Sequence, residues 1–92
     1  MYIVIDGKDT GKTKKLLTEC GKNNGLYVCR HPFGVAEKCR AYGIPEVTAV
    51  SYEDFLQSDD WYTRKIYIDE LEEFVDEFVG PMFSGYTLSK ED

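Results

Sequence analysis

The sequence has few cysteines and no long apolar run. Its three cysteines, Cys20, Cys29 and Cys39, are odd in number and include no C-x-x-C pair, so a disulfide framework and a structural zinc site both fit poorly. No apolar run approaches the roughly 18 residues that a membrane-spanning helix needs, and no charged-then-apolar leader opens the chain. We therefore expect a protein of the reducing cytoplasm that does not insert into a membrane.

An overall excess of positive charge is also absent, because the net charge is −6. Residues 1–50 carry eight Lys or Arg against five acidic residues, and residues 59–92 carry three against ten. This balance argues against a general nucleic-acid binder. Of the eleven cationic side chains, four lie within eight residues, namely Lys8, Lys12, Lys14 and Lys15. Such a local concentration of positive charge suits a compact anion.

With 92 residues, the chain is expected to form a single domain spanning 1–92, because one this short cannot divide its core. Apolar runs predict strands at 2–5, 26–29, 47–50 and 65–68, and a last short strand at 85–89. Helical spacing predicts helices at 12–20, 34–42, 52–57 and 71–79, the first ended by Gly21 and the third opened by a capping box of Ser51 and Asp54. The alternation predicts an α/β three-layer sandwich with a mostly parallel sheet of four to five strands.

The stretch "GKDTGKT", residues 7–13, lies between the first predicted strand and the first predicted helix. In this setting, backbone N–H groups and a helix N-terminus can surround a phosphate chain. The stretch resembles the Walker A motif of P-loop NTPases. The resemblance implies that Lys12 neutralises phosphate and that the Thr13 hydroxyl binds Mg²⁺. Backbone groups of the loop would contact the nucleotide at Gly7, Asp9, Thr10 and Gly11.

The loop departs from G-x-x-x-x-G-K-[ST] at its first glycine, where the sequence has Asp6. Either Asp6 replaces that glycine in a loop of normal length, or Gly7 is that glycine and the loop is one residue short. An acid would repel phosphate in the first case, and fewer donors would remain in the second. The simpler alternative is a polar turn in which Gly7 and Gly11 only reverse the chain.

The stretch "KIYIDE", residues 65–70, resembles a Walker B motif, in which an apolar strand ends in two acids. The resemblance implies that Asp69 holds Mg²⁺ through water together with Thr13, and that Glu70 activates an attacking water as the catalytic base. The alternative is purely structural: Asp69 caps the following helix and Glu72 completes a capping box.

A third group of polar residues ends the predicted strand 26–29. In a parallel sheet, Arg30 and His31 would lie at the same edge as the phosphate loop. There, Arg30 or His31 could contact a phosphate or a base, or could simply end the strand.

The order of these elements resembles the first RecA-like domain of helicases and related ATPases over nearly the whole chain. The stretch "YIVIDGKDTGKT" also resembles thymidylate kinases, but 92 residues leave no room for a lid or a nucleoside pocket. A second RecA-like domain and a recognisable arginine finger are missing. Small P-loop proteins of this kind are familiar among phage and mobile-element reading frames, which suggests a similar origin.

We therefore expect a minimal P-loop protein that binds a nucleoside triphosphate, with ATP as the first candidate, and Mg²⁺. Hydrolysis would be slow, because an arginine finger contributes about 10³ to 10⁵ in rate, and a protein partner or a second copy would have to supply one. The alternative is a binder without enzymatic activity, which sequesters a phosphorylated nucleotide or inhibits a host protein through a degenerate P-loop surface.

Overall fold

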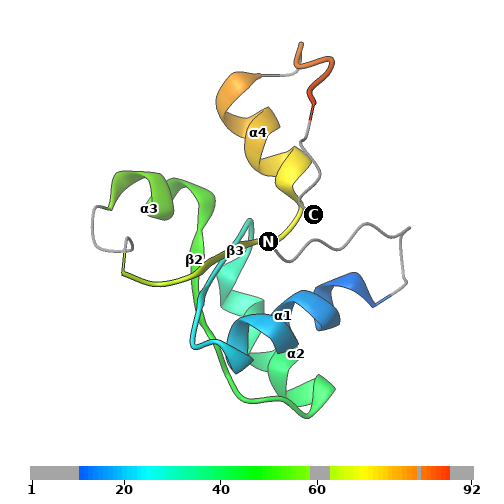
Figure 1. Cartoon of the computed structure of the whole chain (residues 1–92), viewed down its shortest axis with the longest axis vertical. Coiled ribbons are helices and arrows are strands. Elements are labelled where there is room, and N and C mark those ends of the chain that lie inside the picture. The colour runs from blue at the N-terminus through cyan, green and yellow to red at the C-terminus, as the bar shows by residue number, and fades with distance from the viewer. Residues whose placement is uncertain (1–10, 59–62, 81, 88–92) are drawn as a thin grey trace.

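The computed structural model describes residues 11–58, 63–80 and 82–87. Helices and strands alternate along this part of the chain (Figure 1). In order, they are α1 (Lys12–Lys22), β1 (Leu26–Cys29), a 3₁₀ turn (Pro32–Gly34), α2 (Val35–Tyr42), β2 (Thr48–Ser51), α3 (Tyr52–Gln57), β3 (Ile66–Ile68) and α4 (Leu71–Val79).

The three described strands form one parallel sheet in the order β2-β1-β3. Leu26 of β1 is in register with Thr48 of β2 and with Ile66 of β3. All four residues of the central strand β1 are buried, which explains why its sequence shows no polar alternation. The predicted α/β class with a parallel sheet is therefore confirmed for the described residues.

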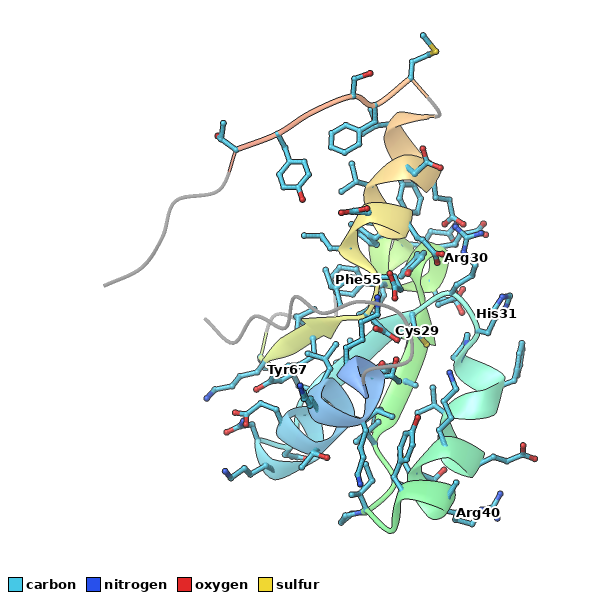
Figure 2. All side chains as sticks on the ribbon, turned by 90° about the vertical axis from the view of Figure 1, so that its right-hand side faces the viewer. Cys29, Arg30, His31, Arg40, Phe55 and Tyr67 are labelled. Carbon is cyan, nitrogen blue, oxygen red and sulfur yellow. The ribbon has the colours of Figure 1, made fainter. Side chains whose placement is uncertain are left out.

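Two further strands were predicted beyond these three. The strand predicted at 2–5 lies outside the described residues. The strand predicted at 85–89 is wrong for its described part, because residues 85–87 have no strand conformation. Residues 82–87 lie at the far end of α4, away from the three described strands (Figures 1 and 2).

Helices cover both faces of the sheet. On one face, α1 and α2 pack on a buried cluster of seven side chains, namely Leu17, Cys20, Tyr27, Cys29, Val35, Cys39 and Tyr67. On the other face, Tyr52 and Phe55 of α3 and Phe74 of α4 pack on side chains of the strands, among them Leu26 and Val28. The three cysteines are free thiols buried in this core.

Helix α1 begins at Lys12, as predicted, but continues through Gly21 to Lys22. Gly21 therefore does not end the helix. A Cβ atom at Gly21 would lie 3.4 Å from Cγ1 of Val47, tighter than most real contacts. The glycine instead allows the segment before β2 to approach the last turn of α1.

Helix α4 has its predicted bounds, 71–79, but its apolar side is mostly uncovered by the described residues. No residue of α4 is buried, and Leu71, Phe78 and Val79 are 45–66% exposed. Its main contact is Phe74, whose ring meets that of Tyr52 edge to face at 5.2 Å. Within the described residues, no helix has the length and apolar character needed to cross a bilayer.

Candidate phosphate and metal site

The first turn of α1 has the backbone geometry of an anion site. Gly11 precedes the helix as its N-cap with φ +80°, a left-handed conformation that glycine adopts without steric cost. Among the described residues, no side chain caps this end, and the first turn contains no acid. The N–H groups and the positive end of the helix dipole are therefore available beside Lys12 and Thr13.

The two acids that follow β3 are held by their backbone. The N–H of Asp69 donates to the carbonyl oxygen of Val28 at 2.9 Å and so extends the pairing of β3 with β1. The Tyr52 hydroxyl donates to the carbonyl oxygen of Asp69 at 2.7 Å, and lies 3.3 Å from that of Glu70. Helix α3 therefore fixes the point at which the two carboxylates leave the sheet.

Glu70, not Asp69, is the N-cap of α4, and no side chain caps this helix among the described residues. The structural alternative for Asp69, an N-cap in a capping box with Glu72, is therefore wrong. Glu70 has φ +55°, which is uncommon for a residue other than glycine. This conformation ends β3 abruptly and begins α4 one residue later.

The fold brings these two segments together at one edge of the sheet. The Thr13 hydroxyl lies 3.5 Å from Oδ2 of Asp69, although 56 residues separate them in the chain. Nζ of Lys12 lies 2.8 Å from Oε1 of Glu70. The hydrogen bond from Lys12 to Glu70, and the negative charges of Glu70, Asp69 and Glu72, raise the pKa of the lysine. The neighbouring acids thus have different partners.

A cavity of about 140 Å³ adjoins this site. We call it the strand-end cavity, because it lies where β1 and β3 end and is lined by side chains that include Tyr27, Arg30, Lys38, Asp69, Glu70 and Glu73. Nε of Arg30 pairs with Oε2 of Glu73 at 3.4 Å. Figure 2 shows Cys29, Arg30 and His31 together at this end of β1, with Arg40 at the opposite end of α2.

Tyr27 is 1% exposed, and its hydroxyl has no hydrogen-bond partner among the described residues. Burial and, after it, the Asp69 carboxylate beside the hydroxyl raise the pKa of this phenol. Buried hydroxyls without a partner are rare in folded proteins. Tyr27 is therefore the most unusual polar group that lines the cavity.

The structure places five of the predicted site residues at one edge of the sheet, namely Gly11, Lys12, Thr13, Asp69 and Glu70. The other predicted loop residues, Asp6, Gly7, Asp9 and Thr10, lie outside the described residues. Tyr27, Lys38 and Tyr52 were not predicted. Tyr27 had one signal in the sequence, a polar tip within the otherwise apolar strand "LYVC". No group of three or more His, Cys, Asp or Glu side chains among the described residues could hold a metal.

Comparisons with protein-family models, curated proteins and solved structures give no match for this chain. Its function therefore has to be inferred from its own residues.

Proposed function

We propose that the chain is a minimal P-loop protein that binds a nucleoside triphosphate, with ATP as the first candidate, together with Mg²⁺. One observation carries the proposal: the hydroxyl of Thr13 and the carboxylate of Asp69 lie 3.5 Å apart across 56 residues of sequence. These two residue types serve one magnesium ion in P-loop NTPases. The alternative, a polar turn that binds no ligand, does not explain why the Thr13 hydroxyl and the Asp69 carboxylate lie close together.

The few protein ligands at this site suit a magnesium ion that also binds water and phosphate, and they do not suit a metal ion whose ligands all come from the protein. Magnesium keeps several waters and usually takes one or two carboxylates plus phosphate oxygens, at about 2.1 Å. Adjacent ligands of such an ion lie about 3 Å apart. The Thr13 and Asp69 oxygens are therefore close enough to serve one ion, directly or through one of its waters. The ion would neutralise phosphate charge.

Phosphate would bind at the first turn of α1, where Gly11 exposes the helix N–H groups and Lys12 supplies a cation. The proposal also includes backbone contacts from Gly7, Asp9 and Thr10 and a P-loop sheet of four to five strands.

Glu70 is the proposed base for hydrolysis. In the structure its carboxylate is paired with Lys12, so phosphate and water must replace this contact before the lysine and the acid can act on them. Because the Glu70–Lys12 ion pair must break in every cycle, we expect slow turnover. A partner or a second copy would supply the missing arginine.

The test is a thermal-shift panel of nucleoside di- and triphosphates, with and without Mg²⁺. Triphosphate with Mg²⁺ should raise the Tm of the wild type. Lys12→Ala should abolish the nucleotide-induced shift and leave the unliganded Tm within about 2 °C, because Lys12 is a half-buried residue outside the core. Lys22→Ala, at the other end of α1, is the matched control and should respond like the wild type. An equal shift in Lys12→Ala would rule out the phosphate-loop interpretation.

A further inference from the structure

The strand-end cavity contains polar groups that the proposed nucleotide contacts do not use. Two of its three acids are already paired: Glu70 with Lys12, and Glu73 with Arg30. Within the described residues, the cation Lys38 and the anion Asp69 have no ion-pair partner, and the Tyr27 hydroxyl has no hydrogen-bond partner. Lys38 and the Tyr27 hydroxyl therefore lie outside the proposed nucleotide contacts, whereas the Asp69 carboxylate, which lies 3.5 Å from the Thr13 hydroxyl, is the proposed metal ligand.

The size of the cavity limits what it can hold. A protein cavity of about 150 Å³ accommodates a ligand of roughly six heavy atoms, whereas pockets for larger ligands measure about 300–1,000 Å³. At about 140 Å³, the cavity has room for one tetrahedral oxyanion and none for a nucleoside.

The charges of the lining residues further restrict which ligands the cavity can bind. Lys38 and the Tyr27 hydroxyl are donors that suit an oxyanion. Asp69 would repel a bare oxyanion from the same cavity, unless a cation on Asp69 reversed the local charge. A metal-bound oxyanion satisfies all three groups at once.

We propose that the strand-end cavity binds a Mg²⁺-bound oxyanion of the size of phosphate, held by the hydroxyl of Tyr27 and the ammonium of Lys38. The inference rests on the metal position at Asp69 that belongs to the proposed function, but not on nucleotide binding. The oxyanion is either the terminal phosphate of a bound triphosphate or free inorganic phosphate.

The test is an amide NMR titration of the whole chain with inorganic phosphate, with and without Mg²⁺. With Mg²⁺, saturable shifts should appear at residues 27–31 and 69, and omitting Mg²⁺ should weaken binding several-fold. Tyr27→Phe should weaken phosphate binding at least tenfold, because a hydrogen bond to a charged group contributes about 1.5–3 kcal/mol. Lys38→Gln should weaken it similarly.

The chain offers a matched control for each variant. Tyr67 is the register partner of Tyr27 on the neighbouring strand and packs in the same core cluster, but it does not line the cavity, so Tyr67→Phe should bind phosphate normally. Arg40→Gln, on the same helix as Lys38, should do the same. A loss of folding would not be mistaken for a loss of binding, because Tyr27→Phe removes a hydroxyl that has no hydrogen-bond partner in the described part of the chain and should leave the Tm equal or higher.

Two outcomes would overturn the proposal: no saturable phosphate binding with Mg²⁺, or equal affinity in Tyr27→Phe and the wild type. A second arm separates the two sources of phosphate. If Tyr27→Phe weakens binding of triphosphate but not of diphosphate, the terminal phosphate occupies the cavity. If it weakens only inorganic phosphate, free phosphate is the ligand.

The same binding measurements also distinguish the cavity proposal from the proposed nucleotide-binding function. Phosphate binding without nucleotide binding would leave only the cavity proposal standing. Nucleotide binding without any effect of Tyr27→Phe would leave only the proposed function.

Discussion

Glu70 is the residue in which backbone conformation and side-chain chemistry are most closely connected. Its positive φ of 55° directs the chain from β3 into α4, and its carboxylate pairs with Lys12 while that of Asp69 lies near Thr13. Unusual backbone conformations of this kind cost about 1–3 kcal/mol and cluster at functional sites. The two acids can therefore perform different steps although they are neighbours in the chain.

Glu70→Gln should separate an ATPase from a simple binder. The amide is nearly isosteric and Asp69 is untouched, so Mg²⁺-nucleotide binding should persist, and it should tighten as the ion pair with Lys12 is lost. Hydrolysis should fall by about 10² to 10⁴, the usual contribution of a positioned general base. The measurement is single-turnover phosphate release at saturating protein.

Glu72→Gln is the matched control for this prediction. Glu72 is an exposed acid of the same helix, whose charge also raises the pKa of Lys12, so this variant removes a charge but no proposed catalytic group. Its hydrolysis should stay near that of the wild type. A wild type that hydrolyses ATP, with an equally fast Glu70→Gln, would remove Glu70 from the mechanism. Negligible turnover in both would identify a binder.

The sequence identified four residues that meet at one edge of the sheet, but it did not identify Tyr27 as a lining residue of the cavity beside them. Lys12, Thr13, Asp69 and Glu70 were predictable because each belongs to a short local pattern next to a strand or a helix. The proximity of Thr13 to Asp69 was implied by the resemblance, but the ion pair of Lys12 with Glu70 was not predictable, because it depends on how the two segments pack. Tyr27 was missed because a tyrosine in a buried strand has the same pattern whether or not its hydroxyl has a partner.

Among the elements, α3 supports the site most directly. Its first residue, Tyr52, is buried, and the hydroxyl of Tyr52 holds the backbone carbonyl of Asp69. The predicted cap of α3 is confirmed, since the Ser51 hydroxyl accepts a hydrogen bond from the N–H of Asp54 at 3.1 Å. Ser51 also ends β2, so a single residue joins the sheet to the helix that positions the acids.

Ser51→Ala should destabilise the protein by about 1 kcal/mol, the usual effect of losing an N-cap side chain. Urea denaturation measures this as a lower midpoint with an unchanged slope. The control is Ser84→Ala, whose exposed hydroxyl bonds only the nearby carbonyl of Met82 and whose effect should stay within about 0.5 kcal/mol. Equal stability of Ser51→Ala and the wild type would show that the cap does not support α3.

The predicted helices and strands agree with the observed ones where the local sequence pattern determines their bounds, and they differ where contacts with other segments do. The strand 26–29 and the helix 71–79 have their predicted bounds, because apolar spacing alone defines them. Gly21 was predicted to end its helix, but the helix continues to Lys22, with the segment before β2 packed beside Gly21. Residues 85–87 have strand-like composition, yet their position beyond α4 leaves them without a neighbour among the described strands.

In the molecule as a whole, the core contains several groups that resist ionisation. Burial raises the pKa of Cys20 to about 11 and raises the pKa of Cys29, Tyr27 and Tyr52 above their usual values. In the unfolded chain the thiols titrate from a value of 9.0. As the pH rises above 9, the unfolded state therefore loses protons that the folded state retains, and this favours unfolding.

The free energy of unfolding should therefore be steady from pH 7 to about 9 and fall as the pH rises from 9 to about 11. Each pKa unit corresponds to about 1.4 kcal/mol, so Cys20 alone accounts for about 2–3 kcal/mol at the end of this range. Urea denaturation at pH 7, 9 and 11 measures the change. Cys20→Ala should show a shallower fall, and stability unchanged at pH 11 would contradict the prediction.

The strand order also dictates when the site can exist during synthesis. β3 is the last of the three described strands in the chain, and it pairs with β1, which is made first. A nascent chain that already contains α1, β1 and β2 carries Lys12 and Thr13 without their acidic partners. The proposed metal pair is complete only once residue 69 of the 92 has been added. Under the proposed function, a ribosome-bound chain that stops before β3 would therefore lack the metal pair and would not compete with the finished protein for Mg²⁺-nucleotide.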